Sequence, residues 1–335
     1  MTFISIDNIL NILASNAKFI MLIECIIAFL ARKTSLIPLY IFLITIKIII
    51  LGHFCANYNL PLKDWNHINN KDIALITGGS NGLGLEIVKA LLMKRVTVYV
   101  FDVTPPSLVK EDEKLIYIKC DIGNEDELQY QTQRIIQDLN STHRHISILI
   151  NNAGIRDNKS LLNLKESRIK SMFNVNIMSQ IWILRNVVNN HLEYVQLQDP
   201  TARLFVVTVS SILGTLAPKN LSVYAATKAA SISLHEAFVQ ELKEYQNTIR
   251  LLLVTTGQLD TGMFKDVIPS KEFFAPIVNH IKLANQIVEY IDIGYSGTLC
   301  QPFYANFLPM VRTFPTNLQE FCRRISEMDE KIKDS

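Results

Sequence analysis

From residue 72 onward, short apolar runs alternate with longer amphipathic stretches. The runs are rich in Val, Ile and Leu and lack a clean polar alternation, which is typical of strands buried on both faces of a sheet. Such strands, when separated by helices, predict an α/β fold with a doubly wound parallel sheet and helices on both faces. The expected strands are 73–77, 96–102, 115–121, 146–154, 203–211 and 249–257, and the expected helices are 83–95, 125–139, 166–192 and 222–245.

The first 56 residues follow a different pattern. Two apolar stretches, 19–31 and 35–56, are separated by Arg32 and Lys33. The second stretch has the roughly 20 apolar residues that a membrane-spanning helix needs, and the first is shorter. We therefore expect a hydrophobic membrane anchor over 1–56, with one or two transmembrane or interfacial helices. A polar linker at 57–71 and a folded domain at 72–335 with an apolar C-terminal extension would follow.

Three other interpretations of the N-terminal segment remain open. A cleaved signal peptide would start with basic residues, whereas no Lys or Arg precedes Lys18. A buried pair of helices inside a soluble domain is the second alternative. A mitochondrial targeting segment, the third, would be amphipathic and rich in arginine, and this segment is neither.

Composition excludes several classes of function. The net charge is only +2, so we expect no binding to nucleic acid. The five cysteines are scattered and have no C-x-x-C spacing, which predicts neither a disulfide framework nor a zinc site. A reducing compartment fits this cysteine usage.

A glycine-rich stretch, LITGGSNGLG, follows the first expected strand and opens the first expected helix. Gly78, Gly82 and Gly84 let the chain turn tightly and approach a ligand closely. Backbone N–H groups at the start of the helix can then bind a pyrophosphate, as in a Rossmann-type fold. Ser80 and Asn81 can add side-chain contacts or cap the helix. A plain strand-to-helix turn would need only one glycine.

Two acidic residues at strand ends complete the expected dinucleotide site. Asp102 ends the second strand, where a carboxylate can accept hydrogen bonds from a ribose diol and would repel a 2′-phosphate. No Lys or Arg occurs at 79–81 or 103–108, so we expect NAD, with NADP less favoured. The alternative is that Asp102 is only a turn residue. Asp121 and Ile122 would contact and flank the adenine.

The stretch YAATK places Tyr224 and Lys228 four residues apart, on one face of an expected helix. A nearby ammonium favours the phenolate and lowers the pKa of a tyrosine, whose ordinary value is about 10. The tyrosine could then exchange a proton with a hydroxyl while a hydride moves to or from a nicotinamide. Ser211, at a neighbouring strand end, can hydrogen-bond the substrate oxygen.

The order of these motifs resembles that of the classical short-chain dehydrogenase/reductase family, from about residue 71 to residue 259 and beyond. TGGSNGLG is similar to the family's cofactor loop, and NNAG at 151–154 is similar to its segment after the fourth strand. The resemblance identifies Asn176, in NVNIMS, as the family's catalytic asparagine. Of the two serines in VSSILG it selects Ser211, which lies the family's 13 residues before the tyrosine.

The resemblance implies a role for each catalytic residue. Tyr224 would be the acid/base, and Lys228 would lower its pKa and bind the nicotinamide ribose. Ser211 would orient and polarise the substrate oxygen, and Asn176 would hold a water that links Lys228 to solvent. The full set of expected cofactor contacts is Gly78, Ser80, Asn81, Gly82, Leu83, Gly84, Asp102, Asp121, Ile122, Asn152, Ala153, Gly154, Tyr224, Lys228, Leu259 and Thr261, and no metal is expected.

One motif departs from the family pattern. The family's P-G-x-[IV]-x-T turn after the sixth strand is TGQLDT here. Gly257 and Thr261 are kept, whereas Thr256 replaces the proline and Leu259 replaces Ile or Val. Leu259 and Thr261 can still hold the carboxamide, but the shape of this turn is in doubt.

The anchor and the C-terminal region are similar to those of the membrane-anchored branch of the family, which acts on steroids, retinoids and other lipid alcohols or ketones. The segment 263–276 has the position of the substrate lid. The segment 301–315 is apolar, with Arg312 alone charged, and would either dock on a bilayer or pack at the sheet edge. The expected partners are a lipophilic small molecule and membrane lipid, and the family resemblance also allows a homo-oligomer.

The resulting functional hypothesis is a membrane-associated oxidoreductase that transfers a hydride between NAD(H) and a lipophilic alcohol or ketone. The alternative is a non-catalytic nucleotide-binding membrane protein that acts as a sensor or tether. Three N-x-S/T sequons occur, and a glycan at Asn220 would obstruct Tyr224. We therefore expect the catalytic domain to face the cytosol, on the endoplasmic reticulum or a lipid droplet.

Overall fold

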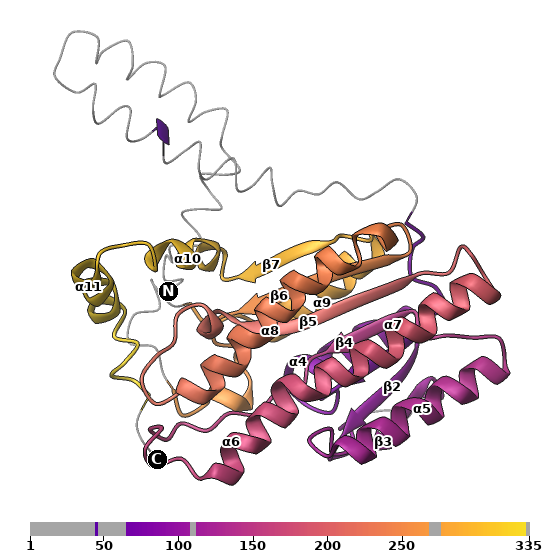
Figure 1. Cartoon of the computed structure of the whole chain (residues 1–335), viewed down its shortest axis with the longest axis horizontal. Helices are drawn as coiled ribbons and strands as arrows, with labels where there is room; N and C mark the ends of the chain where they lie inside the picture. The colour runs from indigo at the N-terminus through magenta and orange to yellow at the C-terminus, as the bar shows by residue number, and fades with distance from the viewer. Residues whose placement is uncertain (1–43, 46–64, 108–111, 268–275, 333–335) are drawn as a thin grey trace, which may run out of the picture.

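The computed structural model describes residues 44–45, 65–107, 112–267 and 276–332. A seven-stranded parallel sheet runs through the described part in the order β3-β2-β1-β4-β5-β6-β7 (Figure 1). The strands are β1 (Ile73–Thr77), β2 (Thr97–Asp102), β3 (Leu115–Lys119), β4 (Ile148–Asn151), β5 (Leu204–Ser211), β6 (Ile249–Thr256) and β7 (Gly297–Gln301). The doubly wound α/β prediction is confirmed. β7 was not expected, because its sequence, GTLCQ, is short and only weakly apolar.

Helices follow most of the strands. They are α4 (Gly82–Met93), α5 (Glu125–Ser141), α6 (Glu166–Phe173), α7 (Ser179–Leu197), α8 (Ser222–Glu241), α9 (His280–Asp292), α10 (Leu308–Val311) and α11 (Thr316–Ser326). The helix expected over 166–192 is α6 and α7 joined by a π-helical turn, Asn174–Met178. Such turns often mark functional positions, and this one contains Asn176.

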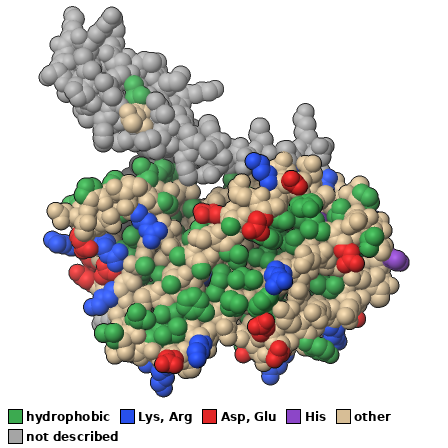
Figure 2. Space-filling view, in the orientation of Figure 1, with side chains coloured by type: hydrophobic (Ala, Val, Ile, Leu, Met, Phe, Trp, Pro, Cys, Tyr) green, Lys and Arg blue, Asp and Glu red, His purple; other side chains and the backbone are tan. Residues whose placement is uncertain are grey.

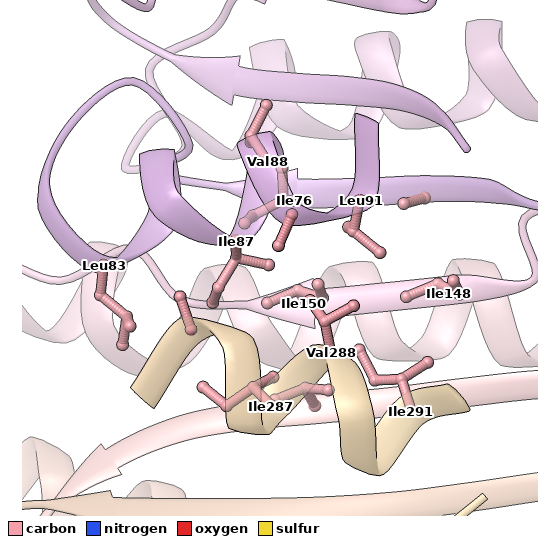
Figure 3. Close-up of a cluster of buried hydrophobic side chains, with 14 of the residues drawn as sticks. Ile76, Leu83, Ile87, Val88, Leu91, Ile148, Ile150, Ile287, Val288 and Ile291 are labelled. Atoms are coloured by element: carbon pink, nitrogen blue, oxygen red, sulfur yellow. The ribbon is translucent and has the colours of Figure 1, made fainter. Parts of the chain in front are cut away.

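Alternation along the strands divides the core into two layers. Ile76 and Ile150 face α4 and α9, where they pack with Ile87 and Ile287 (Figure 3). Their strand neighbours, such as Leu149, face α5, α7 and α8 on the other side. Because successive strand side chains point to opposite faces, both faces are apolar and both are covered by helices. The carboxyl ends of the strands therefore remain as the place for a ligand.

The last part of the expected linker packs onto the folded domain. Trp65 donates its indole N–H to the Ile291 carbonyl oxygen at 3.2 Å, and its ring meets Phe205 edge to face at 5.9 Å. A Cβ at Gly294 would lie 2.2 Å from Cγ of Trp65, so the ring rests directly on that glycine. Residues 65–71 are therefore better assigned to the domain, because the indole ring buries apolar surface against it.

The expected membrane anchor lies outside the described residues, except for 44–45. Within the part of the chain that is described, no helix combines the length and the apolar character that crossing a bilayer requires. The anchor stays a prediction.

The contact between α4 and α9 allows a stability prediction. Ile287 is fully buried between them, whereas Ile281 on the same helix is 47% exposed. Ile287→Ala should lower the free energy of unfolding by about 2–5 kcal/mol, because it removes buried methyl groups and leaves a cavity. The matched change Ile281→Ala should cost less than about 0.5 kcal/mol. Urea unfolding of both variants measures the difference, and equal losses would contradict the packing described here.

Candidate active site

A cavity of about 710 Å³ lies at the carboxyl ends of the central strands. It is lined by every residue that the sequence predicted for the site except Ser80 and Asn176. The motifs, which are spread over residues 78–261, thus converge at one edge of the sheet. The volume falls in the range of small-molecule and cofactor sites.

The turn from β1 into the start of α4, which contains Gly78, Gly82 and Gly84 and is called the glycine turn below, is shaped by close packing. A Cβ at Gly84 would lie 2.0 Å from the carbonyl oxygen of Gly78, so only glycine fits there. Gly78 and Gly82 have φ values of +67° and +53°, which other residues rarely adopt. The Asn152 side chain donates to the Gly78 carbonyl oxygen at 2.9 Å. Asn152 therefore also fastens the turn, a role that the sequence did not predict.

Ser80 lies elsewhere than expected. Its side chain is fully buried, and its hydroxyl donates to the Thr104 carbonyl oxygen at 2.5 Å. It therefore fixes the loop after β2 and does not line the cavity. Asn81 occupies the N-cap of α4, but its side chain makes no capping hydrogen bond, and the first turn of the helix contains no acidic residue. The start of α4 thus presents backbone N–H groups and no negative charge, which fits a pyrophosphate.

The two carboxylates line the cavity in fixed positions. Asp102 accepts hydrogen bonds from the backbone N–H groups of Ser80 at 3.1 Å and Thr104 at 3.2 Å. Asp121 accepts one from the N–H of Gly123 at 2.9 Å, beside Ile122. Because these N–H groups use only part of each carboxylate, lone pairs remain for a ligand. A ribose and an adenine fit this pair of residues.

The structure separates the two adjacent serines. Ser210 is buried and donates to the backbone carbonyl oxygen of Lys228 at 3.0 Å. Ser211 makes a hydrogen bond with Tyr224 and donates to the Thr256 carbonyl oxygen at 3.2 Å. The spacing argument that selected Ser211 therefore agrees with its position beside the tyrosine.

The electrostatics of Tyr224 and Lys228 differ from the expectation. Burial raises the pKa of Tyr224 to about 12, although the hydrogen bond with Ser211 and the charge of Arg156 oppose this rise. Burial also lowers the pKa of Lys228 to about 8. The ammonium of Lys228 donates to the Val209 carbonyl oxygen at 3.0 Å and lies 5.9 Å from the centroid of the Tyr224 ring. The net pKa of Tyr224 is therefore above its ordinary value, because burial dominates, and the groups that oppose the rise are Ser211 and Arg156. The lowering by Lys228 stays a prediction.

Asn176 is fully buried and holds the loop after β4. Its Oδ1 accepts from the N–H of Ile155 at 2.8 Å, and its Nδ2 donates to the Ile155 carbonyl oxygen and to Thr227 Oγ1, both at 2.9 Å. A Cβ at Gly154 would lie 3.4 Å from Nζ of Lys228 and 3.6 Å from Oδ1 of Asn176, so both groups lie close to this glycine. The proton relay through a water stays a prediction.

The turn after β6 keeps its place without the proline. Thr256 is the last residue of β6 and pairs with Gln301, and the N–H of Gly257 donates to the Gln301 carbonyl oxygen at 2.7 Å. Strand β7 thus anchors the turn. Thr261 reaches the glycine turn, since a Cβ at Gly82 would lie 3.3 Å from its methyl group. Leu259 and Thr261 both line the cavity, as expected.

Arg156 was missed by sequence reasoning. It follows NNAG by two residues, and its side chain is only 10% exposed. Its charge acts on Tyr224, and its guanidinium lies over the Phe264 ring. The one sequence signal for Arg156 was a basic residue shortly after NNAG. Basic residues are too common for this position alone to identify a functional residue.

Comparisons with known proteins agree with this fold. A family model described as short chain dehydrogenase matches residues 72–272. The Saccharomyces cerevisiae protein named uncharacterized oxidoreductase TDA5 is 31% identical over 303 residues, which cover 89% of each chain. Among solved structures, 4-hydroxyisoleucine dehydrogenase complexed with NADH has a TM-score of 0.58 at 21% identity and covers 68% of this chain and 96% of its own. A short chain dehydrogenase from Burkholderia cenocepacia J2315 in complex with NADP has a TM-score of 0.59 at 20% identity, with 77% and 99% covered.

The buried Lys228 allows a prediction about stability and pH. Its pKa of about 8 in the folded protein lies below the value of about 10.4 in an unfolded chain. The unfolded state therefore binds the proton more tightly, and the charge destabilises the fold below pH 8 and ceases to do so as pH rises toward 10.4. Lys228→Met should raise the free energy of unfolding at pH 7 by about 1–3 kcal/mol and by less at pH 9.5.

Urea unfolding at the two pH values measures this effect, with the exposed Lys243→Met as the control that should change little at either pH. A loss of stability in Lys228→Met that is equal at pH 7 and pH 9.5 would contradict the prediction.

Proposed function

The chain belongs to the short-chain dehydrogenase family, and we propose that it transfers a hydride between NAD(H) and a lipophilic alcohol or ketone. Family membership makes it an oxidoreductase that uses a nicotinamide dinucleotide. The preference for NAD and the lipophilic substrate are the proposed parts. The observation that carries the proposal is the position of Ser211, which lines both the large cavity and a second, apolar cavity beside it.

The second cavity has a volume of about 310 Å³ and supports an apolar substrate. Ser211, Gly257 and Phe264 lie on the wall that it shares with the first cavity. The rest of its wall is mainly apolar. It includes Leu213 and Leu216 after β5, Val267 after β6, and Leu308, Val311 and Ile332 from the C-terminal part of the chain. An alcohol carbon held at Ser211 would have its apolar portion in this cavity.

The chain's own residues supply the proton chemistry. When bound, the nicotinamide supplies a hydride donor or acceptor. The Ser211 hydroxyl orients the substrate oxygen, and the Tyr224 hydroxyl gives a proton to it or takes one from it. With its raised pKa, Tyr224 stays protonated at neutral pH, so this state of the site is ready to protonate a carbonyl oxygen. The ammonium of Lys228 lies near the ring and stabilises the phenolate that forms.

The preference for NAD is supported by Asp102. Its carboxylate lines the cavity at the end of β2, held by two backbone N–H groups. A 2′-phosphate placed there would meet a fixed negative charge, whereas a ribose diol would find acceptors. No Lys or Arg occurs at 79–81 or 103–108 to offset that charge.

We also propose that the protein works at a membrane, on the cytosolic face of the endoplasmic reticulum or of a lipid droplet. The sequence of residues 1–56 supports an anchor. The C-terminal segment that lines the apolar cavity, residues 304–332, exposes several large apolar side chains. They are Met310, Phe314, Leu318 and Phe321. Lipid contact would cover them.

The homo-oligomer stays a prediction. Figure 2 shows hydrophobic side chains gathered near the middle of the viewed face of the molecule. Pairing with a second copy would cover such a surface.

The cofactor preference can be tested at Asp102. Asp102→Asn keeps an acceptor for the N–H of Ser80 but removes the negative charge. It should weaken NADH binding and strengthen NADPH binding, each by about tenfold, because a hydrogen bond to a charged group contributes about 1.5–3 kcal/mol. Nucleotide fluorescence of the detergent-solubilised protein measures both affinities. As the control, Asp121→Asn should change both affinities alike, and an unchanged NADH-to-NADPH ratio in Asp102→Asn would refute the assignment.

The activity can be tested with 2-alkanols of increasing length and NAD⁺. We expect kcat/KM to rise with chain length while the alkyl group fills the apolar cavity. Tyr224→Phe should lower turnover about 10²–10⁴-fold, because it removes the acid/base group. NADH binding by Tyr224→Phe should remain, which separates lost chemistry from a lost fold. A wild-type protein that binds NADH but oxidises none of these alcohols would instead favour a non-catalytic nucleotide-binding role.

A further inference from the structure

Arg156 connects the loop after β4 to the segment 262–267, which follows the β6 turn. Its Nε donates to the Met263 carbonyl oxygen at 2.6 Å, and its guanidinium forms an ion pair with Asp266. The guanidinium carbon lies 4.5 Å from the centroid of the Phe264 ring. Three contacts therefore join one largely buried arginine to this short segment.

The same segment contacts the proposed acid. The Phe264 ring meets the Tyr224 ring edge to face, with centroids 6.1 Å apart. On the other side, the amide of Gln258 donates to the carbonyl oxygen of Phe264 at 3.2 Å and to that of Val267. Phe264 therefore lies between Arg156 and Tyr224. Its position depends on the contacts that the segment makes with Arg156 and with Gln258.

We propose that Arg156 is a positioning residue that couples the docking of residues 262–267 to the proton transfer by Tyr224. The inference rests on the proposed function. When the segment is docked, the guanidinium is held near the tyrosine and Phe264 closes the wall between the two cavities. When the segment is released, the tyrosine loses both the neighbouring cation and the ring that packs on it.

The charges around Tyr224 explain why the arginine matters. Arg156 faces it from the loop after β4, and Lys228 faces it from its own helix. Ser211 contributes a neutral hydrogen bond from β5. Asp266 and Asp157 are the carboxylates of this region, and Asp157 is paired with Arg168 at 3.2 Å. A cation favours the phenolate, so the charge of Arg156 lowers the pKa of Tyr224 against the effect of burial.

Three substitutions separate charge from geometry. Arg156→Gln removes both the cation and the ion pair. Arg156→Lys keeps the cation but loses the planar fork that reaches Met263 and Asp266 together. Asp266→Asn weakens the ion pair and keeps the arginine.

The readout is the pH dependence of 2-decanol oxidation with NAD⁺. In this direction the phenolate is the active form, so the rate rises with pH up to the pKa of Tyr224. Arg156→Gln should move the profile upward by about half to one pH unit, which lowers kcat/KM about three- to tenfold at pH 9. Arg156→Lys and Asp266→Asn should raise KM severalfold without this upward shift. A profile in Arg156→Gln that matches wild type, or an equal shift in Arg156→Lys, would overturn the inference.

A second measurement does not depend on turnover. The tyrosinate absorbance of each protein, minus that of the same protein carrying Tyr224→Phe, reports the ionisation of Tyr224 alone. Arg156→Gln should have the higher midpoint. If wild type oxidises no 2-decanol, the proposed substrate class fails while this titration still decides the role of Arg156. Equal midpoints in wild type and Arg156→Gln would overturn the inference whatever the substrate is.

Discussion

The burial of the sheet on both faces is the constraint on which the rest of the structure depends. Helices cover the apolar side chains of every central strand on both faces of the sheet. A ligand and the side chains that bind it therefore have to lie where the strands end. Parallel strands all end at the same edge. Residues as distant in sequence as Gly78, Asp102, Ser211 and Thr261 thus line a single cavity.

Sequence reasoning worked where a residue type is needed for a local shape or a local reaction. Gly84 could be predicted because a side chain there would meet the Gly78 carbonyl oxygen, and such positions recur with a fixed spacing. Tyr224 and Lys228 could be paired because helical periodicity alone places them together. The choice of Ser211 over Ser210 was also available from spacing.

Other features depend on tertiary contacts that no local pattern encodes. Ser80 leaves the cavity because Thr104, on the next loop, accepts from its hydroxyl. The pKa of Tyr224 is set mainly by burial, which depends on how distant segments pack around the ring. Arg156 is held in place by Asp266, 110 residues later in the chain. β7 is defined by its pairing with β6, because its own short sequence has no strong strand pattern.

The indole of Trp65 rests against Phe205 and Ile291, next to the amino end of β5. The proposed reaction takes place at the carboxyl ends of the strands, at the opposite edge of the sheet, about 25 Å away along an eight-residue strand. The chain thus enters the domain on the side remote from its catalytic groups.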